Sequence, residues 1–305
     1  MQMKFIQALA LLSLASNVLG KLQEMTWVLD PDHVSYMPME YEEYIFSHEI
    51  VHSGPHPEFN LTFVSYGKYA LDEHIGTHMD APYHFVKDGK HIAEIPLEDL
   101  NGPLVAIDIS KKASEVQDAS VLVEDLLVWE RKYGEIPPRS FVLMSSGWDA
   151  FWGDNEKFVG SNDPKGSFHF PGFSPEAAQW LLDNRNILGL GMDSLSCDPM
   201  SRLFQTHKIV LPAGKFCVEN LRNIGKVPEC GARFMILPIM LKGATGSQTR
   251  AFAEYFPGVG YQTSCKGTLR QTSSYFDGSS APAIVPSIFT ITALILVLLN
   301  FSYVY

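Results

Sequence analysis

The chain has few cysteines and few basic residues, and it lacks one common hydrolase motif. Its four cysteines form no C-x-x-C pair, which argues against a cysteine-based metal site. It has 23 Lys and Arg against 34 Asp and Glu, for a formal net charge of −11, which argues against nucleic acid as a partner. No G-x-S-x-G sequence is present, so nothing indicates the nucleophile elbow of a serine hydrolase.

Long hydrophobic runs are confined to the two ends of the chain. At the start, Lys4 precedes an apolar run and small residues come before Lys21. This pattern is typical of a signal peptide over residues 1–20, and the run is short for a membrane-anchoring helix, which is the alternative.

The end of the chain has a different pattern. Small residues at 278–280 are followed by an apolar tail, residues 281–305, with no basic residue after it. This favours a GPI-anchor signal over a transmembrane tail. We therefore expect a secretory-pathway protein at the cell surface or outside the cell, attached to the membrane by its C-terminal anchor.

Between these ends, residues 21–258 suit one domain, followed by a linker at 259–280. In an exported chain the four cysteines allow two disulfides. Cys230 and Cys265 are the preferred pair, whereas Cys197 and Cys217 either pair or remain buried thiols. Asn60 begins an Asn-Leu-Thr sequon for glycosylation.

The order of predicted elements indicates an α/β domain. Helices are predicted where apolar residues recur at helical spacing, at 121–134, and where Ser174 and Pro175 form a helix start, at 174–186. Apolar runs of strand length and composition precede, separate and follow them, at 61–66, 104–109, 140–145, 187–192 and 234–241.

The segment HIGTHMDAPYHF, residues 74–85, concentrates the chemistry of the sequence. Two imidazoles and a carboxylate, from His74, His78 and Asp80, form a ligand set suited to Zn²⁺ or Mn²⁺. In a straight strand His74 and His78 would lie about 13 Å apart, too far for one ion. Gly76 and Pro82 permit the bend that convergence requires. The alternative is a solvated loop that happens to be rich in histidine.

A second group of polar residues lies far downstream, in THKIVLPAGKFCVENLRN. His207 and Glu219 are twelve residues apart, each within apolar sequence. Taken alone, His207 reads as a buried core histidine and Glu219 as a surface charge.

The whole pattern resembles the cyclase family of metal-dependent hydrolases, which includes bacterial-type kynurenine formamidase and isatin hydrolase. The segment 74–85 is similar to the family signature, and the later segments IPLEDLNGPLVAIDIS, SSGWDAFW, HFPGFSPEAAQWLL, LGLGMDSLSCDP, VENLRNI and GATGSQTRAFA resemble the family in its order. The resemblance covers residues 25–255.

The resemblance implies a fold and a site. The fold is α/β, with a mixed β-sheet curled toward a barrel and peripheral helices, and members associate as homodimers or homotetramers. One or two divalent ions, Zn²⁺ or Mn²⁺, are expected in each subunit. The implied ligands are His74, His78, Asp80, His207 and Glu219.

Other residues are expected to act on the substrate or to support the site. The resemblance gives His84 the role of proton shuttle, and Trp27 is a candidate for contact with the substrate. Asp193 and Ser196 are expected to support the ligands.

The expected reaction is cleavage of a non-peptide C–N amide bond in a small molecule by metal-activated hydroxide. The resemblance points to N-formylkynurenine, giving kynurenine and formate in tryptophan catabolism, or to a cyclic amide such as isatin. A cell-surface metal-containing binding protein without turnover is the alternative, because an anchored protein with a closed metal site need not catalyse.

Overall fold

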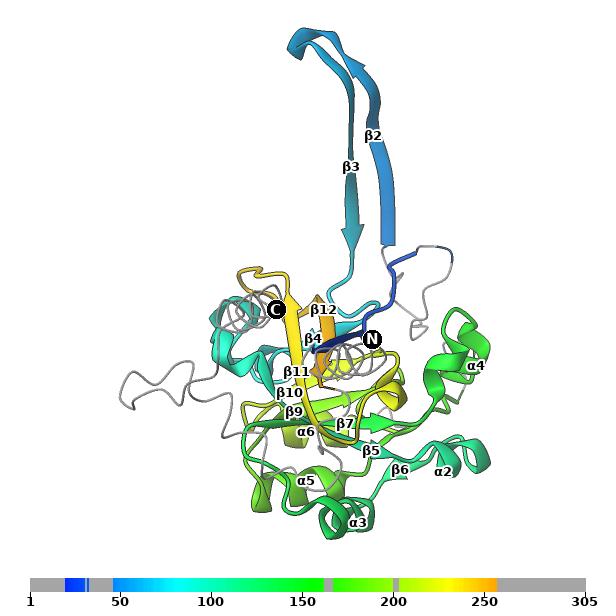
Figure 1. Cartoon of the computed structure of the whole chain (residues 1–305), viewed down its shortest axis with the longest axis vertical. Helices are drawn as coiled ribbons and strands as arrows, with labels where there is room; N and C mark the ends of the chain where they lie inside the picture. Colours follow the sequence, from blue (N-terminus) through cyan, green and yellow to red (C-terminus); the bar gives the residue numbers. More distant parts are fainter. Residues whose placement is uncertain (1–19, 31, 33–45, 162–166, 200–202, 257–305) are drawn as a thin grey trace, which may run out of the picture. The chain divides into compact units, whose positions relative to one another are not determined.

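The computed structural model describes residues 20–30, 32, 46–161, 167–199 and 203–256. Its main feature is a sheet that closes into a ring (Figure 1). Seven strands follow one another around the ring in the order β12-β11-β5-β7-β9-β10-β4, and β4 pairs back onto β12. They are β4 (His78–Asp80), β5 (Asn101–Asp108), β7 (Ser140–Ser145), β9 (Ile187–Met192), β10 (Phe216–Glu219), β11 (Cys230–Pro238) and β12 (Gly246–Tyr255).

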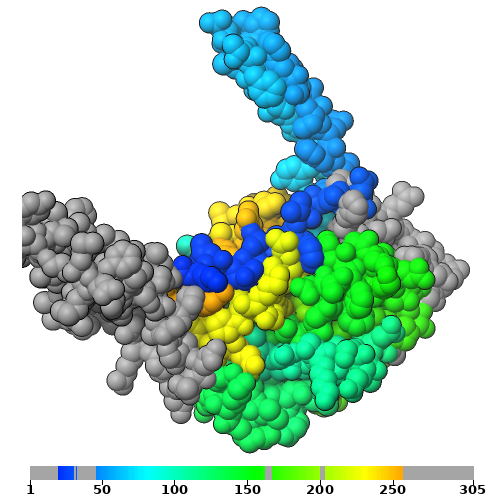
Figure 2. Space-filling model, turned by 45° about the vertical axis from the view of Figure 1, so that its right-hand side comes forward, coloured from blue at the N-terminus to red at the C-terminus, as the bar shows by residue number. Residues whose placement is uncertain are grey.

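The ring is mixed in strand direction. Strands β5, β7, β9 and β10 pair in parallel, while β4, β11 and β12 join by antiparallel pairing. Strand β1 (Lys21–Glu24) lies outside the ring. It pairs with the C-terminal part of β12, residues 252–255, whereas β4 pairs with the N-terminal part of that strand. Figure 2 shows this blue N-terminal segment against the yellow and orange strands. The predicted mixed sheet curled toward a barrel is therefore confirmed.

Short helices connect the strands. The α-helices are α2 (Ser110–Glu115), α3 (Val123–Tyr133), α4 (Asn155–Val159), α5 (Pro175–Asn184) and α6 (Gln205–Val210). The 3₁₀ helices are η1 (Pro57–Phe59), η2 (Pro82–His84), η3 (Ile92–Glu94), η4 (Leu97–Asp99), η5 (Trp148–Phe151) and η6 (Ile224–Lys226). A small separate sheet pairs β6 (Ser120–Val121) with β8 (Gly172–Phe173).

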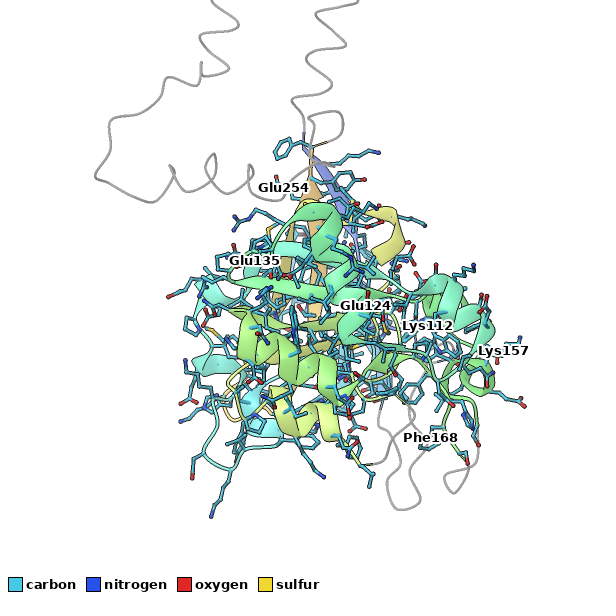
Figure 3. All side chains as sticks on the ribbon, turned by 90° about the horizontal axis from the view of Figure 1, so that it is seen from below. Lys112, Glu124, Glu135, Lys157, Phe168 and Glu254 are labelled. Carbon is cyan, nitrogen blue, oxygen red and sulfur yellow. The ribbon has the colours of Figure 1, made fainter. Side chains whose placement is uncertain are left out.

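The two predicted helices form for the expected reasons. Ser174 caps α5, where its hydroxyl accepts a hydrogen bond from the N–H of Ala177, and Pro175 is the first helical residue. Helix α3 ends at Gly134, which adopts φ 90°. Charged residues such as Glu124 and Lys157 lie on the outside of the helical side (Figure 3).

The parallel strands are buried on both faces, so their alternate residues enter two separate cores. In β7, Phe141 and Leu143 pack inside the ring, where they join Phe234 of β11. Val142 and Met144 point the other way, into a second core that includes side chains of α3 and α5. This double burial explains why these strands read as continuous apolar runs in the sequence.

The predicted strand at 61–66 exists but does not belong to the ring. It is part of β3 (Leu61–Leu71), which among the described strands pairs only with β2 (Phe46–His56) as an antiparallel hairpin. Most side chains of the hairpin are exposed. Asn60, the predicted glycosylation site, is exposed at the hairpin turn with φ 53°.

Several predictions concern residues at the edge of the described structure. Cys230, at the start of β11, is disulfide-bonded, and its predicted partner Cys265 lies outside the described residues. Nearly all of the predicted signal peptide and the whole C-terminal tail also lie outside them. Within the described ranges, no helix is long and apolar enough to cross a membrane.

We predict that Phe141→Ala lowers the free energy of unfolding by about 3–5 kcal/mol, because it removes a ring that is fully buried inside the barrel against Phe234. Val128→Ala is the matched control, since Val128 is half exposed on α3 and its change should stay within about 0.5 kcal/mol. Urea unfolding followed by tryptophan fluorescence measures both. Equal losses in the two variants would contradict this account of the core.

Candidate metal centre

The histidine-rich segment bends where its glycine permits. Gly76 adopts φ 67°, and the chain enters β4 only at His78. The bend brings the rings of His74 and His78 to 5.2 Å between centroids, well short of their separation in a straight strand. The η2 turn then folds His84 back, so that its ring stacks on that of His74 at 4.0 Å.

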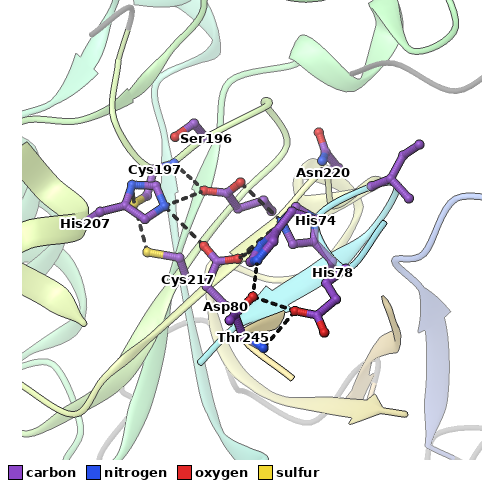
Figure 4. A network of polar contacts seen from close by, with 12 residues as sticks. His74, His78, Asp80, Ser196, Cys197, His207, Cys217, Asn220 and Thr245 are labelled. Carbon is purple, nitrogen blue, oxygen red and sulfur yellow. Dashed lines mark hydrogen bonds and ion pairs between the residues drawn. The ribbon is translucent and has the colours of Figure 1, made fainter. Parts of the chain in front are cut away.

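Ring closure brings the downstream residues to the same place. Glu219 ends β10, directly opposite His78 of β4 in the antiparallel register. His207 comes from α6, and its Nε2 lies 3.2 Å from Asp80 Oδ2 and 3.4 Å from Glu219 Oε1. The six residues predicted as ligands or proton shuttle thus lie together, and Figure 4 shows the network around Asp80.

Each of the three histidines predicted as ligands has one ring nitrogen, the one that faces away from the carboxylates, within hydrogen-bond distance of an anchoring group. His78 Nδ1 donates to the carbonyl of Gly76 at 2.9 Å, and His207 Nδ1 donates to Asp198 Oδ2 at 2.6 Å. His74 Nε2 lies 2.9 Å from Thr245 Oγ1.

The proton on His74 follows from its neighbours. The hydroxyl of Thr245 donates its single proton to Glu73 Oε2, so its oxygen accepts from His74 Nε2. In all three rings the remaining nitrogen therefore faces the carboxylates. Histidines that bind metal ions in proteins are oriented in the same way, by a hydrogen bond from the other ring nitrogen.

Glycine at 246 is required beside this centre. A Cβ at Gly246 would lie 2.5 Å from the ring of His74. Gly246 pairs with Asp80 across β12 and β4. The backbone of β12 can therefore approach the imidazole of His74 this closely only because residue 246 has no side chain.

The spacings of His78 from Asp80 and Glu219 fit a metal ion, whereas His74 Nδ1 lies at hydrogen-bond distance, 2.7 Å, from Asp80 Oδ1. His78 Nε2 lies 3.3 Å from Asp80 Oδ1 and 3.5 Å from Glu219 Oε2. Donors at about 2.0–2.2 Å from one ion stand roughly 3.0–3.5 Å apart. His78 Nε2 is also buried and makes no hydrogen bond among the described residues, so an ion that displaced its proton would give this nitrogen a partner.

The pKa values of the two carboxyl groups are shifted in opposite directions. Burial alone would raise the pKa of Asp80, but the imidazoles of His74, His207 and His78 hold it well below its usual range. Burial, together with repulsion from Asp80, raises the pKa of Glu219 to about 7. Two buried carboxyl groups thus face the same imidazoles, and a divalent cation would satisfy both.

Asp80 also divides the centre into two neighbouring groups. Its Oδ1 faces His74 and His78, while its Oδ2 faces His207. The donors of Asp80, His84 and His207 form a second group close enough to hold an ion. A shared carboxylate between two groups is consistent with the expectation of one or two ions per subunit.

Trp27 lies beside the centre but is enclosed by other groups. Its backbone N–H donates to Thr77 Oγ1 at 3.0 Å, one residue before His78. Its ring stacks on Trp152 at 5.2 Å, and the Arg222 guanidinium lies 5.1 Å from its centroid. Contact with a substrate therefore stays a prediction for Trp27, and the edge of the ring carries an Nε1 without a partner among the described residues.

The two predicted supporting residues act at a distance from the ligands. Asp193 accepts hydrogen bonds from the N–H groups of Ser146 and Gly147 and from the Ser146 hydroxyl. Burial, which these donors only partly offset, raises its pKa to about 7. Ser196 Oγ accepts from the N–H of Asp198. Asp193 therefore orders the chain after β7, and Ser196 reaches His207 only through Asp198.

Sequence reasoning missed the residues that orient the ligands. Asp198 and Thr245 anchor His207 and His74, and Asn220 Nδ2 donates to the carbonyl of Gly76 at the bend. Asp198 and Thr245 lie in segments that resemble the family, SLSCDP and GATGS. Their place inside those segments is the sequence signal for both residues, but it does not indicate which histidine each one anchors.

The fold and the site define a class: α/β barrel proteins with a histidine–carboxylate cluster that could hold a metal ion. Comparisons with known proteins agree. Residues 23–199 match the Cyclase family. Isatin hydrolase of Roseibium aggregatum is 30% identical over 201 residues, covering 63% of this chain and 75% of the relative. Kynurenine formamidase of Bordetella petrii is 26% identical over 189 residues, covering 62% and 79%.

Solved structures agree as well. Isatin hydrolase A from Labrenzia aggregata has a TM-score of 0.72 and 30% identity, covering 83% of this chain and 99% of that structure. The chain therefore belongs to the Cyclase family of metal-dependent hydrolases.

We predict that Asp198→Asn weakens metal affinity about 10- to 100-fold, because it replaces the carboxylate that anchors His207 Nδ1. Asp118→Asn is the matched control: Asp118 binds His169 at 2.9 Å in a half-buried pair that includes no predicted ligand. Competition with a chromogenic chelator for Zn²⁺ and Mn²⁺ gives both affinities. An unchanged affinity in Asp198→Asn would show that the anchor does not matter to the metal.

Proposed function

We propose that this chain is a metal-dependent amidohydrolase that cleaves a non-peptide C–N amide bond in a small aromatic substrate. The observation that carries the proposal is the convergence of three imidazole nitrogens on Asp80 and Glu219, with His84 beside them. A divalent ion bound there would polarise a carbonyl group and make a water acidic enough to ionise near neutral pH. The donor set accommodates Zn²⁺ and Mn²⁺ alike.

The protein's own contribution to proton transfer is assigned to His84. Loss of water around its ring lowers the pKa of His84 to about 4; the charge of Asp80 opposes this shift, and the neighbouring imidazoles add to it. His84 is thus neutral at pH 7 and can accept the proton that the attacking water releases. The imidazolium formed is a strong enough acid to return that proton to the departing nitrogen.

Aromatic side chains around the centre support an aryl substrate. The ring of Phe85 stacks on His207 at 5.0 Å, and Phe204 lies 5.7 Å from both. Such surfaces favour flat apolar ligands. The named activities of the relatives, isatin hydrolase and kynurenine formamidase, both concern aryl amides. We therefore propose an aryl formamide such as N-formylkynurenine or a cyclic amide such as isatin as substrate.

Export and assembly are part of the same proposal. The signal peptide, the C-terminal anchor and a homodimer or homotetramer stay predictions from the sequence. A surface-exposed Asn60 suits glycosylation in the secretory pathway. An enzyme with these signals would meet its substrate outside the cell.

We predict that the purified protein hydrolyses at least one of N-formylkynurenine and isatin in a metal-dependent manner. Treatment with a chelator should abolish turnover, and Zn²⁺ or Mn²⁺ should restore it. The reason is that the predicted ligands alone cannot polarise a carbonyl group or make a water molecule acidic. Absorbance assays on both substrates, run side by side, measure this. Stoichiometric metal binding without turnover on either aryl amide would contradict the proposal and favour a binding protein.

We predict that His84→Ala retains its metal but loses about 10²- to 10⁴-fold in kcat, because the proton relay is removed. His91→Ala is the matched control, since His91 is seven residues away, partly exposed and paired with Glu94. Metal content by mass spectrometry and kcat are measured on the same samples. Loss of metal from His84→Ala would instead make His84 a ligand, as its grouping with Asp80 and His207 allows.

A further inference from the structure

Two buried thiols lie in contact next to the metal centre. Cys197 Sγ and Cys217 Sγ are 2.8 Å apart, and both residues are fully buried and free (Figure 4). Cys197 lies in the segment after β9, whereas Cys217 is in β10. The contact therefore joins two parts of the chain that are twenty residues apart.

The thiol pair touches the predicted ligands on several sides. The N–H of Cys197 donates to Glu219 Oε1 at 2.9 Å, and its Sγ lies 3.2 Å from His207 Nδ1. Cys217 is opposite Asp80 in the β10–β4 register. A change in the covalent state of the pair would therefore act directly on the residues that hold Glu219 and His207.

A second ion on these sulfurs fits the structure poorly. His207 Nδ1 would have to be the third ligand, but it already donates to Asp198 at 2.6 Å. Two sulfurs alone fall short of the four ligands that a thiolate zinc site uses. A bond between the sulfurs needs no further ligand.

We propose that Cys197 and Cys217 are a redox-active pair whose disulfide fixes the His207 segment against strand β10. The proposed oxidant is hydrogen peroxide, which meets the fully buried sulfurs during local opening of the chain. One thiol reduces the peroxide to water and becomes a sulfenic acid; the second thiol then attacks that sulfur and expels a second water. Overall, two thiols and one peroxide give one disulfide and two waters.

The disulfide would close residues 198–216 into a loop. That loop contains α6 with His207, as well as Asp198, which anchors it. The S–S bond of about 2.05 Å needs only a small approach of the sulfurs from 2.8 Å. Because both ends of the loop become fixed to one another, we expect the oxidised protein to release metal more slowly and to unfold at a higher temperature.

The test uses the full chain loaded with Zn²⁺ and treated with a small molar excess of hydrogen peroxide. Free thiols are then alkylated under denaturing conditions, and peptides are mapped by mass spectrometry without reduction. We expect a Cys197–Cys217 linked peptide, a Tm increase of roughly 5–10 °C, and severalfold slower transfer of zinc to a chelator.

Cys217→Ala is the matched control and should show neither the Tm increase nor the slower transfer after peroxide, which separates the disulfide from oxidation elsewhere. Cys197→Ser provides the same control if Cys217→Ala does not fold. Full alkylation of both cysteines after peroxide, or sulfinic acids without a link, would overturn the proposal. So would a second zinc per chain that disappears in either variant. None of these readouts needs a substrate. The linked peptide and the Tm do not depend on the proposed function, whereas the zinc transfer rate rests on the proposed metal centre.

Discussion

The buried carboxylate of Asp80 is the constraint on which the rest of this structure depends. A charge removed from water needs compensating partners, and Asp80 finds them in His74 from a turn, His78 from its own strand and His207 from α6. Its strand β4 is also the one that closes the ring, by pairing with β10 and β12. Closure of the barrel and assembly of the centre are therefore one structural event.

The sequence predicted those parts whose signal is local. The parallel strands are buried on both faces, so β5, β7 and β9 appear as uninterrupted apolar runs. The cap at Ser174 depends on its immediate neighbours. The bend at Gly76 follows from distance alone, since His74 and His78 cannot share an ion in a straight strand.

The parts that the sequence could not show depend on long-range pairing. Glu219 faces His78 only because β10 and β4 are adjacent in the ring, and nothing near either residue records that register. Asp198 and Thr245 are single polar residues whose importance appears only once the histidine rings are placed. The run at 61–66 has strand composition, yet composition does not distinguish an exposed hairpin from a core strand.

Metal binding and folding are linked in such a centre. Without an ion, the carboxylates of Asp80 and Glu219 are balanced by protons. Burial alone would lower the pKa of His78, but Asp80 and Glu219 raise it. The pKa of His207 is raised against the effect of burial by Cys217, Asp198 and Asp80. An ion would displace those protons and take over the balancing charge, so its binding energy also stabilises the closed ring. The predicted ligands come from β4 and the turn before it, from β10 and from α6, and the contact of Cys197 with Cys217 links the segment between β9 and α6 to β10. The same few contacts therefore hold the barrel closed, orient His207 and set how firmly an ion is retained.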